Sequence, residues 1–67
     1  MTSTALAGRR CRTNKWVESP QGRIAAMSEG KIRYVCENLG RLLVRVDWDR
    51  GGSAMLFPEE IELFDVA

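Results

Sequence analysis

The chain has 67 residues, which limits it to one small domain. It is 45% hydrophobic and 28% charged, as soluble globular domains are, and no apolar run approaches the ~20 residues that a membrane-spanning helix needs. The net charge is +1 and there is no histidine, which removes the side chain most often used for general base catalysis and zinc binding.

The N-terminal segment, residues 1–14, has no helical or strand period and is predicted to be a disordered basic arm. The first fifteen residues carry four positive charges and no acid, whereas the remaining residues are mildly acidic. A basic arm can contact nucleic acid or an acidic partner, and the alternative is a solvated, mobile terminus.

The two cysteines, Cys11 and Cys36, are predicted to be free thiols. A disulfide scaffold of this size normally uses four or more cysteines. The first residues also lack the charged start and long apolar core of a secretory signal. We therefore expect a reducing, cytoplasmic location.

The first expected strands are short. Residues 15–18 form a β-prone run that ends at a turn predicted from Pro20 and Gly22. Residues 23–27 are predicted to form the next strand, because a run of five residues is too short for a stable helix. A single helical turn is the alternative there. Residues 28–30 then suit a hairpin connection.

The most regular alternation occupies two neighbouring segments that are separated by a turn at residues 38–40. Residues 31–37 alternate so that one face carries Ile32, Tyr34 and Cys36. Cys36 is therefore predicted to be a small buried hydrophobe. Residues 41–49 form the strand around which the chain is organised, and its apolar face carries Leu42, Val44, Val46 and Trp48.

The C-terminal part begins with Gly51, Gly52 and their neighbours, which have the composition of a hairpin turn. A strand is predicted to follow at residues 54–57. Pro58 and the two acids after it predict one 3₁₀-like turn, because proline suits the first helical position and acids suit the positive end. Residues 61–65 supply a short closing strand.

This pattern of five or six short antiparallel strands with glycine-containing turns predicts an all-β domain over residues 15–67. A sandwich of two full sheets usually needs roughly 100 residues, so a small, strongly bent barrel is expected. Closing the sheet would also remove its exposed edges.

Three segments carry a family resemblance: the glycine before an apolar strand at residues 22–24, the Val-x-Val-x-Trp-Asp strand at residues 44–49 with its Gly-Gly-Ser continuation, and Leu-Phe-Pro-Glu-Glu-Ile-Glu-Leu at residues 56–63. Together they resemble small bacterial SH3-like barrels, many of them families of unknown function, over about residues 15–65. The chain also looks similar to barrel subunits attached to redox and photosynthetic complexes and, more distantly, to KOW-type ribosomal and transcription barrels. The ALYDY-type aromatic groove of signalling SH3 domains is missing, so the resemblance does not imply binding of proline-rich peptides.

No catalytic constellation is visible, and we expect no enzyme activity, cofactor, metal or small-molecule substrate. Asp47 and Asp49 share a face and offer carboxylates for a cation together with Asp65 or Glu59. The favoured interpretation is a hairpin in which Asp49 accepts hydrogen bonds from turn amides, while arginines on neighbouring strands offset the charge.

The sequence predicts a non-catalytic module that docks onto a protein partner in a larger assembly, because aromatic residues and arginine anchor interfaces. Its proposed contact residues are Trp16, Tyr34, Arg41 and Arg45. Trp48 is assigned to the core, since it continues an apolar alternation, and Trp16 is the better exposed candidate. The alternative is nucleic-acid binding, through phosphate contacts and base stacking, by Arg9, Arg10, Arg12, Arg23 and Arg33.

Overall fold

The computed structural model describes residues 2–19 and 22–64, and within these ranges it contains strands and one 3₁₀ helix but no α-helix. The predicted all-β class and the 3₁₀ turn at Pro58 are therefore confirmed. The described strands number eight, more than the five or six expected. In chain order the elements are β1 (Thr2–Ser3), β2 (Arg10–Thr13), β3 (Val17–Ser19), β4 (Gly22–Ile24), β5 (Glu29–Asn38), β6 (Arg41–Trp48), β7 (Ser53–Leu56), η1 (Pro58–Glu60) and β8 (Ile61–Leu63).

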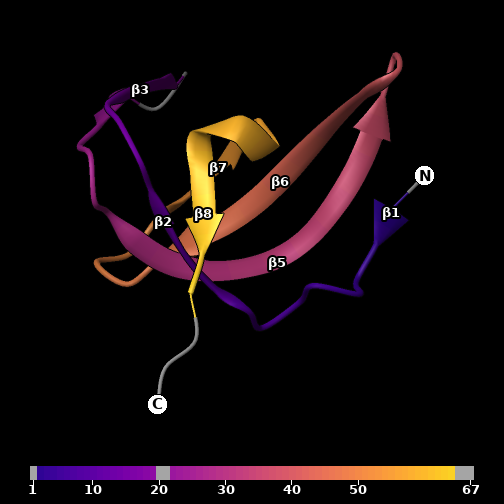
Figure 1. Cartoon of the computed structure of the whole chain (residues 1–67), viewed down its shortest axis with the longest axis horizontal. Coiled ribbons are helices and arrows are strands. Elements are labelled where there is room, and N and C mark those ends of the chain that lie inside the picture. The colour runs from indigo at the N-terminus through magenta and orange to yellow at the C-terminus, as the bar shows by residue number, and fades with distance from the viewer. Residues whose placement is uncertain (1, 20–21, 65–67) are drawn as a thin grey trace.

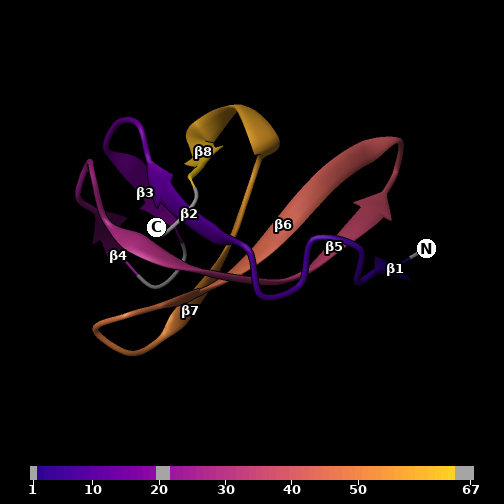
Figure 2. The ribbon, with the colours of Figure 1, turned by 60° about the horizontal axis from the view of Figure 1, so that its bottom comes forward.

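Most strands belong to one antiparallel sheet with the order β7-β6-β5-β2-β8, and β1 adds to β5 beside this path. The strands β3 and β4 form a separate hairpin. The long, curved β5–β6 hairpin projects from the body, on the side opposite β3 and β4 (Figures 1 and 2). Among the described residues β7 and β8 remain edge strands, so the sheet is strongly bent but not closed.

The prediction of a disordered arm over residues 1–14 is wrong for β2, which lies inside the sheet between β5 and β8. Cys11 and Thr13 face inward and are fully buried. The Thr13 hydroxyl donates to the Ala25 carbonyl at 2.8 Å and accepts from the Ser28 amide at 3.0 Å, so it is satisfied. The strand escaped detection because its inward residues are small and its outward ones are arginines.

The turn predicted at residues 38–40 is confirmed between β5 and β6. Leu39 and Gly40 have φ angles of 53° and 79°, and positive φ at both central residues is typical of a type I′ hairpin. The Leu39 side chain is 96% exposed at this tip. Leu42 is also 52% exposed, because the hairpin extends beyond the last β7 pairing, Val44 with Leu56.

A register irregularity between Ile32 and Tyr34 corrects the predicted faces of β5. Ile32 pairs with Val46 on the core side, as expected, but the extra residue shifts the alternation. Val35 therefore takes the core position opposite Val44, while Tyr34 and Cys36 turn to the other face. The prediction that Cys36 is buried in the core is accordingly wrong, and its side chain is half-buried on the outer side.

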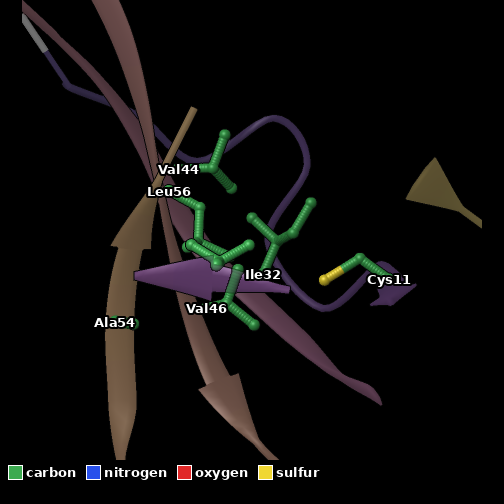
Figure 3. Close-up of a cluster of buried hydrophobic side chains, with 7 residues drawn as sticks. Cys11, Ile32, Val44, Val46, Ala54 and Leu56 are labelled. Atoms are coloured by element: carbon green, nitrogen blue, oxygen red, sulfur yellow. The ribbon is translucent and has the colours of Figure 1, made fainter. Parts of the chain in front are cut away.

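The core lies on the inner face of the bent sheet, where side chains from several strands meet (Figure 3). Val46 and Ile32 contribute from the central strands, and Ala54 and Leu56 from the edge strand β7. The apolar residues Val44 and Val46 of β6 thus face the core, as the alternation predicts. Trp48, half-buried, packs against this cluster, as its pattern predicts.

The segment predicted as a strand over residues 23–27 is a strand only up to Ile24. The chain then turns through Met27, whose φ is 65°, and no helical turn forms among these residues. The Met27 amide donates to the Thr13 carbonyl at 2.9 Å, which fastens the loop to β2. The predicted turn at Pro20 lies outside the described residues.

Candidate functional site

The outer face of β5, β6 and β7, opposite the core, carries apolar side chains at its centre. Tyr34, Arg45 and Met55 lie in one row across the three strands, and Cys36 pairs with Leu43 in β6. All five side chains are half-buried. We call these five residues the apolar outer face. A solvated sheet face usually alternates polar residues with the core, so this composition is typical of a covered surface.

Next to this face, Arg41 lies over the ring of Phe57, with its guanidinium carbon 4.4 Å from the ring centroid. The same guanidinium is 3.5 Å from Glu59, at the start of the 3₁₀ turn. Phe57 remains 37% exposed. This stacked pair extends the outer surface toward the projecting hairpin.

Arg45 occupies the centre of the apolar outer face. One terminal nitrogen donates to Ser53 Oγ at 2.7 Å. Its Nε is buried and has no hydrogen-bond partner among the described residues. Buried donors are normally satisfied, so this group calls for an explanation.

The outer side of β2 is different, because ion pairs cover it. Arg10 donates to both carboxylate oxygens of Asp49, at 2.8 and 2.6 Å, and reaches Glu29 at 3.2 Å. Arg12 pairs with Glu62 at 2.7 Å. Both guanidinium groups lie over the Phe64 ring, at 5.7 and 5.3 Å. Ion pairs thus dominate the outer side of β2, whereas apolar side chains gather at the centre of the outer face of β5, β6 and β7.

The Arg10–Asp49 pair predicts a measurable dependence of the stability of the domain on acidic pH. The hydrogen bond from Arg10 holds the pKa of Asp49 below its ordinary value. Its carboxylate therefore contributes stability above the ordinary Asp pKa of ~3.9, and this is lost as pH falls through the lower folded-state pKa. We expect Asp49→Asn to flatten the fall in Tm between about pH 5 and pH 2.

The control for this thermal titration is Glu18→Gln, which removes the carboxylate of the exposed Glu18–Arg23 pair on β3 and β4. Its Tm should follow the wild-type dependence on pH, because exposed pairs contribute little. An unchanged acid slope in the Asp49 variant would contradict the assigned pair.

Of the four residues predicted to contact a partner, the structure brings three to one side. Tyr34 and Arg45 are cross-strand neighbours, and Arg41 lies on the same face of β6 as Arg45. Trp16 is separate, in the loop before β3, where Arg23 lies over its ring at 5.8 Å. It is 62% exposed, in agreement with the sequence.

The predicted cation alternative at Asp47 and Asp49 is not supported, because arginines occupy both carboxylates. Arg33 donates to Asp47 at 3.0 Å and Arg10 holds Asp49. No group of three or more potential metal ligands occurs in the part of the chain that the structure describes, and Asp65 lies outside it. The hairpin itself is confirmed, but the Gly51 amide donates to the Trp48 carbonyl, at 3.0 Å, rather than to a carboxylate.

Sequence reasoning missed a groove of about 570 Å³ between the loop after β4 and the turn after β6. Trp48 lines it together with Ile24 and Met27. The indole packs against the core and also borders the groove, since its size allows both contacts. Alternation alone assigns such a residue to one side only.

The two thiols lie in contrasting surroundings and form no disulfide within the described ranges. Cys11 is fully buried, and desolvation raises its pKa to about 11. Cys36 lies on the apolar outer face. Only the thiolate reacts, and a fully buried sulfur is also shielded from the reagent, so we expect iodoacetamide to label Cys36 in the native protein and to leave Cys11 unlabelled.

This difference can be measured by mass spectrometry of the intact chain over time. A Cys36→Ser variant should stay unlabelled until denaturant is added, whereas Cys11→Ser should be labelled in the native state. Rapid native labelling of Cys11 would show that β2 opens readily.

The chain matches no protein-family model, no curated protein and no solved structure. Within residues 2–19 and 22–64, no helix has the length and apolar character that crossing a bilayer requires. The described features define a bent all-β domain whose outer surface has an apolar centre on β5, β6 and β7 and ion pairs around it.

Proposed function

We propose that this chain is a non-catalytic module that docks onto a protein partner, as an accessory part of a larger assembly. The observation that carries the proposal is the apolar outer face, at whose centre Tyr34, Arg45 and Met55 form one row. Tyrosine, arginine and methionine are enriched in protein interfaces. A partner covering this face would bury side chains that are now only half-buried.

We also propose that the fold is an open form of the bacterial SH3-like barrel. Five strands in the order β7-β6-β5-β2-β8, with a 3₁₀ turn between β7 and β8, support this assignment. Fold alone does not assign function, since SH3-like barrels host unrelated activities. The docking proposal therefore depends on the face. Two unpaired thiols fit the proposed cytoplasmic location.

The nucleic-acid alternative has less support. Of its five arginines, Arg10, Arg12, Arg23 and Arg33 each pair with a carboxylate of the chain. Phosphate binding would have to compete with these pairs. Affinity for single-stranded RNA that falls steeply with salt would favour this alternative, because phosphate contacts release counterions.

The docking proposal is tested by placing a photo-crosslinking amino acid at Met55 in the full chain, in lysate of the source cells. A crosslinked protein that survives nuclease treatment is expected from this position, and Tyr34→Ala should reduce its yield about tenfold, as loss of an aromatic anchor does. The control position is Glu18, which lies on β3. Equal yields from both positions, or no product at Met55, would refute the proposal.

A further inference from the structure

Arg45 differs from the other arginines of the described sheet in how its charge is balanced. Arg10, Arg12, Arg23, Arg33 and Arg41 all have a carboxylate within 3.5 Å. No carboxylate of the described residues forms an ion pair with Arg45. Asp47 lies two residues along the same face, but Arg33 already holds it.

The polar contacts of Arg45 also leave much of its hydrogen-bonding capacity unused. The guanidinium has five N–H donors in a fixed plane. One terminal nitrogen donates to the neutral hydroxyl of Ser53 at 2.7 Å, and the buried Nε has no acceptor within the described ranges. Tyr34 and Met55 flank the residue on the neighbouring strands. The buried Nε–H of Arg45 therefore lies unmatched among apolar side chains, and the rest of its planar donor fork has only one neutral acceptor among the described residues.

The carboxylates around Arg45 are already matched by other arginines. The outer side of β5 and β6 bears four cationic groups, Lys31, Arg33, Arg41 and Arg45. Four carboxylates lie on or beside this side, Glu29, Asp47, Asp49 and Glu59, and each is already paired with an arginine other than Arg45. Arg45 therefore has the capacity to receive an incoming anion.

We propose that Arg45 is the receptor for a carboxylate of the protein partner, an Asp or Glu side chain flanked by apolar residues. This inference rests on the proposed function, of which it specifies the partner's chemistry. A carboxylate matches the guanidinium fork in plane and spacing, and can accept from two of its N–H groups. Phosphate groups are bound by clusters of arginines, whereas Arg33 and Arg41 are already paired.

The probes for the test are 4-methylpentanoate, a carboxylate with an apolar tail, and its neutral amide, 4-methylpentanamide. Each is titrated into the ¹⁵N-labelled full chain, and the Nε–H resonance of Arg45 is followed by NMR. We expect the carboxylate to move this resonance saturably and to bind at least tenfold more tightly than the amide.

Two variants at the site and one control establish where the preference arises. Arg45→Lys keeps the charge but loses the fork, and Arg45→Met keeps a similar length without charge. Binding to these variants is followed by the backbone amide resonances of Tyr34 and Met55, and both variants should reduce the preference for carboxylate to under twofold. Arg33→Lys should retain it, since Arg33 is already paired with Asp47. Thermal unfolding of each variant shows whether it is folded.

The outcomes separate this inference from the docking proposal. Equal binding of both probes on the apolar outer face would overturn the role of Arg45 but leave that face a docking surface. In the NMR titration, a saturable shift centred on the Nε–H resonance of Arg33 or Arg41, or no shift at Arg45, would overturn the inference. This holds whichever protein is crosslinked at position 55. If position 55 captures no protein, the docking proposal fails independently of the NMR result.

Discussion

Gly30→Ala is expected to destabilise the fold by about 3 kcal/mol, at the upper end of the cost of overpacking a core. Gly30 is buried where β5 lies between β2 and β6, opposite Cys11 and Trp48. A Cβ there would press on the carbonyl oxygen of Asp47 and lie 2.9 Å from Val46 Cγ1. The backbone carbonyl of Asp47 cannot rotate away as a flexible side chain can. The strands of the sheet must therefore shift.

Chemical denaturation followed by tryptophan fluorescence measures this loss. The control is Lys31→Ala, which changes the next residue, where the side chain is exposed, and should alter stability by less than about 0.5 kcal/mol. Because small domains are stable by only ~5–15 kcal/mol, Gly30→Ala should remove a large fraction of the free energy of unfolding. Similar midpoints for the two variants would mean that the three strands are not packed as described.

Leu56→Ala is expected to cost about 2–5 kcal/mol, the range for removing a buried leucine side chain. Leu56 is 1% exposed and pairs with Val44 at the edge strand β7. The strands of a domain of this size share one core. Removing the Leu56 side chain therefore leaves a cavity in that core beside the edge strand β7. The loss combines the transfer of the removed methyl groups with the cavity that remains.

A matched control exists, because Leu42→Ala makes the same chemical change on the inner face of β6. Leu42 is 52% exposed beyond the end of β7, so its truncation should cost less than about 1 kcal/mol. Urea midpoints of the two variants provide the comparison. If Leu42→Ala proved the more damaging, the projecting part of the hairpin would belong to the core.

The local pattern predicted the central hairpin well. Period-two alternation places Val44 and Val46 inward along β6, and the turn chemistry of residues 38–40 gives its connection to β5. The 3₁₀ turn at Pro58 was equally readable, because proline and acids act within one turn. These features depend on residues that are neighbours in the sequence, so the sequence of one chain is enough to predict them.

Features that depend on distant residues were not predicted. The strand β2 has small inward residues, and only its placement between β5 and β8 makes Cys11 and Thr13 core positions. The irregularity after Ile32 reverses the alternation of β5 and cannot be read from an uninterrupted pattern. Consequently the sequence predicts Tyr34 as a contact residue without Met55, which lies in the same row across the strands. It likewise predicts Arg10 as a nucleic-acid contact without its ion-pair partner Asp49.

The same placement of β2 has a consequence for how the protein is made. During synthesis this strand leaves the ribosome well before one of its two neighbours, β8, which spans Ile61–Leu63 and emerges about fifty residues later. The meander of β5, β6 and β7 has only short connections and can form first. Until β8 arrives, β2 presents an open backbone edge and Arg12 lacks its partner Glu62, and the nascent chain is then most exposed to wrong pairing.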